Sequence, residues 1–247
     1  MSLLTVQREG AGAPIAWLHG FTQTRTSAHE YRSILAGARE VWTLDLPGHG
    51  DACDVRATLS ETADLVAQAL GDDPVDLGGY SFGARVALHV ALAYPARVRR
   101  LVLLGASRGI RDPSERRARR ESDERLARHV EEVGAETFLA EWLAQPLFAS
   151  LGDASEPESR SRDRAGLAAS LRLAGTGTQS WLGDRLGEIS IPVLALAGER
   201  DEKFCAEALA IAAGVRDGRA TLISGAGHAA HLEAPAACAR VVGEFLG

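Results

Sequence analysis

The sequence contains few cysteines, no long apolar run and no excess of positive charge. Its three cysteines, Cys53, Cys205 and Cys238, are scattered along 247 residues and odd in number. Such spacing indicates neither a disulfide framework nor a metal site. We interpret all three as small apolar residues in a reducing cytoplasm, and we expect no metal.

No apolar stretch reaches the length that crosses a membrane, and the first nine residues lack the apolar run of a signal peptide. We therefore expect a cytoplasmic protein without a membrane partner. The net charge of −6 argues against binding to nucleic acid. The length fits one α/β domain, alone or with a large insertion.

Apolar stretches and helical patterns alternate in the first part of the chain. Strands are predicted over 14–18, 41–45, 74–79 and 99–105, and helices over 58–70 and 81–93. Near the end, strands are predicted over 191–198 and 219–223, and helices over 203–214 and 234–246. Such alternation predicts an α/β fold with a mostly parallel sheet and helices on both faces.

The alternation stops between residues 107 and 186. This segment has helical patterns throughout, with arginine and glutamate dense in its first part and glycine and serine in its middle. Because it follows the central strands, we expect a helical cap (107–186) over the carboxyl edge of the sheet. Residues 1–106 and 187–247 would then form the core.

A Gly-x-Ser-x-Gly pattern, Gly79 to Gly83, lies where a predicted strand gives way to a predicted helix. A serine at such a corner has a strained backbone, and its hydroxyl projects from the carboxyl end of the sheet. Side chains at Gly79 or Gly83 would collide with neighbouring backbone in so tight a turn. The pattern favours Ser81 as a reactive hydroxyl over an ordinary Gly/Ser turn.

A reactive serine needs a base, and the base needs an orienting carboxylate. His228 lies in the loop after the last predicted strand, and Asp201 follows the preceding strand. All three side chains would project from one edge of a parallel sheet, in the order Ser, Asp, His that α/β-hydrolases use. The backbone N–H groups of Phe21 and Phe82 are the expected oxyanion hole.

Other histidines and a second aspartate compete for these roles. His231 is close to His228 in the sequence, but we expect it to hold the loop that precedes the final helix. His19 and His49 lie in turns beside the site, where a structural hydrogen bond is the favoured interpretation. Asp45 ends a strand but precedes the serine, and we interpret it as a turn residue.

The whole chain resembles the α/β-hydrolase superfamily and, more narrowly, the 2-succinyl-6-hydroxy-2,4-cyclohexadiene-1-carboxylate synthases of menaquinone biosynthesis. The resemblance lies in residues 17–21, 45–50, 79–85, 141–151, 171–179 and 198–204. Residues 141–151, Glu-Trp-Leu-Ala-Gln-Pro-Leu-Phe-Ala-Ser-Leu, are the most telling. Departures from the family pattern are Leu143-Ala144 for Tyr-Gln, Ser107-Arg108-Gly109 for His-Pro-Gly, and a rearranged segment at 180–183.

The resemblance implies a cofactor-free lyase that eliminates pyruvate from a succinyl-bearing cyclohexene dicarboxylate. In that family the triad serine is the base that removes a ring proton, and no acyl-enzyme forms. The resemblance also implies substrate contacts from Tyr80, Trp142, Arg119 and an arginine near Arg160 or Arg162. A solvated helix face is the alternative for Arg119, which stands among Arg116, Arg117 and Arg120.

Arg85 stands out without the resemblance. It follows Ser81 by one helical turn in an otherwise apolar helix, where a charged residue needs a partner. Its register points it toward the site. The small-molecule substrate that the resemblance implies is a polycarboxylate, which would require several fixed cations. We therefore predict a substrate contact; pairing with an acidic neighbour is the alternative.

Two other functions stay open at this level. A serine hydrolase, either a carboxylesterase or a C–C bond hydrolase, would use Ser81 as a nucleophile. A binding protein without activity could share the fold, because fold alone does not decide function. Nothing in the sequence distinguishes a monomer from a small homo-oligomer.

Overall fold

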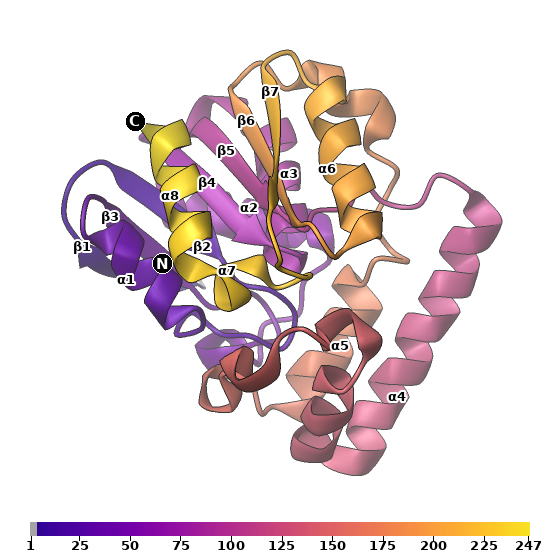
Figure 1. Cartoon of the computed structure of the whole chain (residues 1–247). Coiled ribbons are helices and arrows are strands. Elements are labelled where there is room, and N and C mark those ends of the chain that lie inside the picture. The colour runs from indigo at the N-terminus through magenta and orange to yellow at the C-terminus, as the bar shows by residue number, and fades with distance from the viewer. Residues whose placement is uncertain (1–3) are drawn as a thin grey trace.

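The computed structural model describes residues 4–247. Within them, seven strands form one sheet in the order β1-β3-β2-β4-β5-β6-β7 (Figure 1). Strand β1 (Gln7–Gly10) is antiparallel to its neighbour, and all other pairs are parallel. The parallel strands are β2 (Pro14–Leu18), β3 (Glu40–Leu44), β4 (Val75–Tyr80), β5 (Val98–Leu104), β6 (Val193–Gly198) and β7 (Gly218–Ile223).

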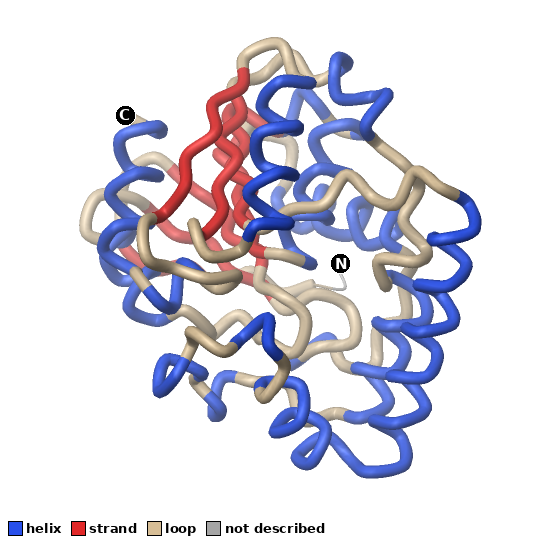
Figure 2. Tube along the Cα trace, turned by 45° about the vertical axis from the view of Figure 1, so that its right-hand side comes forward, coloured by secondary structure: helices blue, strands red, loops and turns tan. Residues whose placement is uncertain are grey.

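Helices cover both faces of this sheet (Figures 1 and 2). One face packs against α2 (Leu59–Leu70), α3 (Phe82–Ala93) and α6 (Glu202–Gly214), the other against α1 (His29–Ala36) and α8 (Pro235–Leu246). In β5, Leu101 and Leu103 enter the first core and Val102 and Leu104 the second, as alternation along a strand requires. The predicted α/β architecture is confirmed.

Two elements of the first forty residues were not predicted. Strand β1 is mostly exposed and lacks an alternating apolar pattern. Helix α1 has no side-chain cap of its own, because its N-cap residue is Ala28. The carboxylate of Glu156, which is 128 positions away, accepts the N–H groups of Ala28 and His29 at 2.6 and 3.2 Å.

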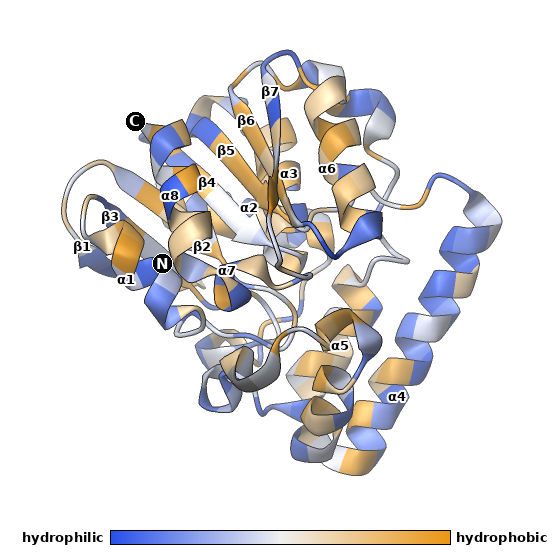
Figure 3. Ribbon diagram, viewed as in Figure 1, coloured by the Kyte–Doolittle hydropathy of each residue, from blue (hydrophilic) through white to orange (hydrophobic). Residues whose placement is uncertain are grey.

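The chain between β5 and β6 contains α4 (Pro113–Leu143) and α5 (Arg164–Ala174), which lie side by side below the sheet (Figure 1). They share a small core that includes Val130, Phe138 and Leu167. In Figure 3 the first turns of α4 are hydrophilic, whereas β5 and β6 are largely hydrophobic. None of the helices between residues 4 and 247 is long and apolar enough to cross a membrane.

The expectation that residues 107–186 are helical throughout was wrong. Between α4 and α5 the chain forms three 3₁₀ turns, η3 (Pro146–Phe148), η4 (Gly152–Ser155) and η5 (Pro157–Ser159). A fourth, η6 (Gly183–Glu188), precedes β6. Proline cannot continue a helix, because it lacks the N–H group and its ring clashes with the preceding turn. Helix α4 itself breaks at Gly134, whose φ is 82°.

A short helix, α7 (Ala230–Glu233), follows β7 and comes directly before α8. It was not predicted as a separate element. Its single turn starts two residues after His228, so the loop that contains His228 runs from β7 to the start of α7.

Candidate active site

Ser81 occupies the corner between β4 and α3 in a strained backbone conformation, with φ 50° and ψ −102°. A Cβ on Gly79 would lie 2.5 Å from the carbonyl carbon of Gly83, and a Cβ on Gly83 would lie 2.2 Å from the oxygen of Leu18. Neither contact is tolerable, so both glycines are required. Strain of this kind places the serine hydroxyl outside the sheet edge.

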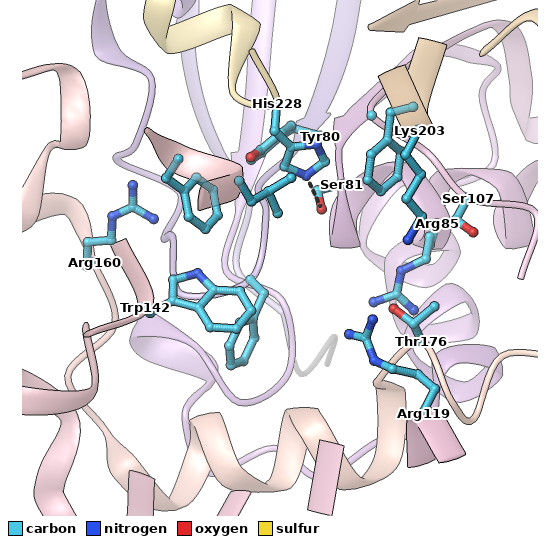
Figure 4. Close-up of a pocket in the computed structure, with 15 residues that line it drawn as sticks. Tyr80, Ser81, Arg85, Ser107, Arg119, Trp142, Arg160, Thr176, Lys203 and His228 are labelled. Atoms are coloured by element: carbon cyan, nitrogen blue, oxygen red, sulfur yellow. Dashed lines mark hydrogen bonds between the residues drawn. The ribbon is translucent and has the colours of Figure 1, made fainter. Parts of the chain in front are cut away.

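Ser81, His228 and Asp201, from three loops at this edge of the sheet, are linked by two hydrogen bonds. Figure 4 shows the bond between His228 and Ser81. His228 Nε2 lies 3.2 Å from Ser81 Oγ, and His228 Nδ1 lies 2.7 Å from Asp201 Oδ2. A carboxylate only accepts, so Nδ1–H donates to Asp201 and Nε2 is left to accept the serine proton. Both His228 and Asp201 are buried, so water does not compete for these bonds.

Phe82 directly follows Ser81 in the chain, and Phe21 lines the same pocket as Ser81. Phe82 is the first residue of α3, so its N–H belongs to the free N–H groups of the helix N-terminus. Phe21 lines the pocket, and its loop is tied down because Thr22 N–H donates to His49 Nε2 at 3.3 Å. Burial, together with neighbouring His19, lowers the pKa of His49 to about 3, so it stays neutral and able to accept.

The competing residues lie in other environments. His19 Nε2 accepts the N–H of Leu46, a backbone contact between two loops. The carboxylate of Asp45 accepts the N–H of Asp51 within its own turn and the N–H of Arg25 from the loop after β2. His231 is buried against the ring of Tyr80, and neither of its nitrogens has a partner within the described part of the chain. These contacts are structural, and none reaches Ser81.

A pocket of about 160 Å³ opens at Ser81 between the sheet edge and the inserted helices. The five side chains expected to contact substrate all line it, with Ser81 and His228: Tyr80, Arg85, Arg119, Trp142 and Arg160. In Figure 4, Arg85 and Arg119 lie on one side of Ser81 and Arg160 lies on the other. The insertion and the core thus contribute cations to one cavity.

Arg85 is a buried cation that forms no ion pair within the described residues, although the carboxylate of Asp123 is close enough to interact with it electrostatically. One guanidinium nitrogen donates to the carbonyl of Ala174 at 3.0 Å and to Gln179 Oε1 at 3.4 Å. Its other two nitrogens have no hydrogen-bond partner, and no carboxylate forms an ion pair with it, within residues 4–247. Burial and the nearby Arg119 lower the pKa of Arg85 to about 10. The cation persists at neutral pH, and an anion in the pocket would stabilise it.

Arg119 is held in place by a buried carboxylate. Its Nε donates at 2.7 Å to Asp123, one helical turn away, and Asp123 also accepts the N–H of Gly177 at 3.0 Å. The neighbouring Arg116, Arg117 and Arg120 do not line the pocket. The geometry therefore separates Arg119 from the solvated helix face.

The structure also separates Arg160 from Arg162, since Arg160 lines the pocket and Arg162 is exposed. Arg160 donates to Thr22 Oγ1 at 2.8 Å and twice to the carbonyl of Ser155, at 2.8 and 3.0 Å. Burial lowers the pKa of its guanidinium from the ordinary value. Arg160 thus ties the insertion to the loop that carries Phe21.

Comparisons with known proteins decide the family. Residues 15–241 match the model of the alpha/beta hydrolase family. The chain is 35% identical over 244 residues to a 2-succinyl-6-hydroxy-2,4-cyclohexadiene-1-carboxylate synthase of Klebsiella pneumoniae, covering 94% of this chain and 93% of that one. The chain belongs to this family of synthases within the α/β-hydrolases.

Solved structures agree with this membership. MenH from S. aureus superposes with a TM-score of 0.91 at 30% identity, covering 100% of this chain and 98% of that chain. An esterase from Thermogutta terrifontis superposes with a TM-score of 0.85 at 26% identity, covering 98% and 92%. The family resemblance of the sequence is confirmed.

Several pocket residues of this synthase-family chain were not predicted. The most important is Lys203, at the start of α6, whose ammonium lies 5.3 Å from the ring centre of Phe204 and has no ion pair in the described structure. It follows Asp201 by only two residues, and this nearness in the sequence to a predicted site residue could have indicated that Lys203 lines the pocket. The other unpredicted lining residues are Gly105, Ser107, Leu147, Phe148, Thr176 and Phe204.

Proposed function

We propose that this chain catalyses the reaction for which its relatives are named. It is a cofactor-free lyase that eliminates pyruvate from a succinyl-bearing cyclohexene dicarboxylate, giving 2-succinyl-6-hydroxy-2,4-cyclohexadiene-1-carboxylate. The observation that carries the proposal is the buried guanidinium of Arg85, which lines the serine pocket and forms no ion pair with any carboxylate of residues 4–247. A buried cation that lines the pocket favours an anionic substrate over a neutral ester.

The proposed reaction starts at the triad. Asp201 orients His228, whose Nε2 takes the proton of Ser81, and the serine oxygen then removes a ring proton from the substrate. The electron pair of the broken C–H bond enters the ring as a double bond, and the C–O bond to the leaving group breaks. Pyruvate departs as its enolate and is then protonated.

Charge that develops on the substrate carbonyl oxygen requires donors already in place. The N–H groups of Phe21 and Phe82 supply them in this proposal, and fixed donors of this kind stabilise a transition state without reorganising. The neutral His49 keeps the Phe21 loop in position. Removing one such donor typically costs about 10²–10³-fold in rate.

The pocket offers separate places for the ring and for the carboxylates. Arg85, Arg119 and Lys203 lie on one side of Ser81, and Arg160 lies on the other side (Figure 4). We assign these two sides to different carboxylates of the substrate. Trp142 packs edge-on against Phe21, with ring centres 5.1 Å apart, and gives the ring an apolar wall between them. Tyr80 adds a hydroxyl on the Arg160 side.

This proposal includes the division of the chain. Residues 1–106 and 187–247 form the hydrolase core and residues 107–186 the cap, which supplies Arg119, Trp142 and Arg160. On composition we expect the enzyme in the cytoplasm, acting on a small molecule without nucleic acid or membrane, as a monomer or small homo-oligomer.

The deciding experiment is a coupled assay for pyruvate, with the purified chain and the substrate of the named relatives. Pyruvate release that disappears in Ser81→Ala supports the proposal. The absence of release from wild-type enzyme, with rapid hydrolysis of neutral esters, would contradict it.

The esterase of similar structure keeps one alternative open, a serine hydrolase in which Ser81 is a nucleophile. A nucleophile forms a covalent intermediate, whereas a base does not. Mass spectrometry of enzyme quenched during turnover should therefore show an unmodified chain. An adduct on Ser81 with the natural substrate would favour the hydrolase.

A further inference from the structure

The loop that carries His228 has a second anchor besides Asp201. The carboxylate of Glu233, on the next helix, turns back toward this loop. Its Oε2 accepts the N–H of Gly227 at 2.7 Å, and its Oε1 accepts the N–H of Ala229 at 3.1 Å. One carboxylate thus holds the peptide groups on both sides of His228.

Within residues 4–247 these two N–H groups donate to no acceptor other than Glu233, and the nearest hydroxyl, that of Ser150, lies beside Gly227 without accepting from it. Gly227, His228 and Ala229 are all buried, so water does not readily replace the carboxylate. Ala229 is the N-cap of α7, and its methyl side chain cannot cap a helix. Buried N–H groups that lose their acceptor are costly, so the loop would move to satisfy them.

Movement of this loop translates directly into movement of the base. The ring of His228 bridges Asp201 at 2.7 Å and Ser81 at 3.2 Å, so a small displacement of its backbone lengthens one of these bonds. Misplacement of a reacting group by about 1 Å can cost on the order of 100-fold in rate. Glu233 does not line the pocket at Ser81, so a role that acts through His228 involves no contact with the substrate.

We propose that Glu233 is a positioning residue that sets the placement of His228 by holding the N–H groups of Gly227 and Ala229. The role rests on the proposed function, because it assumes that His228 is the base. Its signature is a loss of kcat without a comparable change in KM. A residue that merely stabilised the fold would instead lower activity in proportion to the unfolded fraction.

The same loop supplies a matched control in Glu199. Its Oε2 accepts the N–H of Gly225 at 3.0 Å and the hydroxyl of Ser224 at 2.9 Å, at the other end of the loop. Glu199→Ala therefore removes two hydrogen bonds from this loop, but none beside His228. The comparison of Glu233→Ala with Glu199→Ala separates positioning from loop stability.

The experiment measures kcat and KM for pyruvate release in both alanine variants and in Glu233→Gln, each corrected for the folded fraction. We expect kcat to fall about 10- to 100-fold in Glu233→Ala, with KM within about twofold, and to change little in Glu199→Ala. Glu233→Gln keeps one acceptor oxygen and should lose roughly three- to tenfold. It provides the test if the alanine variant does not fold.

A second readout needs no substrate. We expect the proton between His228 Nδ1 and Asp201 to give a far-downfield NMR resonance in the wild type. This resonance should broaden or vanish in Glu233→Ala and persist in Glu199→Ala. Wild-type kcat in Glu233→Gln, or equal losses of kcat and of this resonance in the two alanine variants, would overturn the proposal. If the wild type releases no pyruvate, the proposed function fails, while aryl ester hydrolysis and the resonance still test Glu233.

Discussion

Replacement of Arg85 gives the sharpest test of how the pocket selects its substrate. Two of its guanidinium nitrogens have no hydrogen-bond partner within residues 4–247 and could bind a carboxylate through parallel hydrogen bonds, while the third donates to Ala174 and Gln179. Each charge-assisted bond contributes about 1.5–3 kcal/mol. Lysine keeps the charge but loses the fork, and with it one bond to the carboxylate.

A tenfold change in rate corresponds to about 1.4 kcal/mol. Arg85→Lys should therefore lower kcat/KM for pyruvate release about tenfold or more, and Arg85→Ala about a hundredfold. Residual hydrolysis of an aryl acetate should hardly change, because this ester has no carboxylate to bind. Both substrates are assayed with each variant, and melting temperatures are measured in parallel.

Arg172→Ala is the matched control. This arginine pairs with Glu124 and Glu131 in the insertion and does not line the pocket. Its loss should leave kcat/KM for both substrates unchanged. The reasoning is refuted if Arg85→Ala lowers the melting temperature and depresses both reactions of the folded enzyme alike, since Arg85 would then act only through the fold.

The remaining predictions concern the triad and a buried histidine. Ser81→Ala and His228→Ala should each lower kcat by about 10³-fold or more, and the double variant should be little worse, because triad members act as a unit; losses that multiply would contradict the assignment. Burial, with Arg160 and His228 nearby, lowers the pKa of His231 to about 3. Between pH 6.5 and about 3 the unfolded chain binds this proton and the folded chain does not, so stability falls as the pH is lowered through this range. Between pH 7 and pH 5, the free energy of unfolding measured with urea should decrease by about 2 kcal/mol less in His231→Phe than in wild type. Equal decreases in the two proteins would exclude this role.

The triad and the sheet were predictable because their signals are local. Apolar stretches that end in Gly-rich turns identify strands, and the carboxyl ends of parallel strands necessarily meet at one edge. Ser81, Asp201 and His228 each follow such a strand, so their convergence required no knowledge of the packing. The register of Arg85, one turn after the serine, was equally local.

Contacts between distant parts of the chain had no such signal. The cap of α1 is Glu156, 128 positions away, so no local pattern marked that helix. The choice of Arg160 over Arg162 depended on which side of one short segment packs against the Phe21 loop. Helix breakers in residues 144–163 outweighed the helical pattern expected there, since proline removes backbone hydrogen bonds that side-chain periodicity cannot restore.

The sequence by itself determined the fold through periodicity and turn residues, and it indicated the family through the motifs that resemble it. Chain order also predicted that Ser81, Asp201 and His228 would meet, as their hydrogen bonds show. Only the tertiary structure decided the charge balance of the pocket. Whether Arg85 has a counter-ion, and whether Lys203 faces the same cavity, depends on segments about 90 to 120 positions apart being brought together. Glu233 contacts residues only six and four positions away in the sequence. A role for these contacts in placing His228 could be inferred only from the structure, in which His228 lies between Asp201 and Ser81.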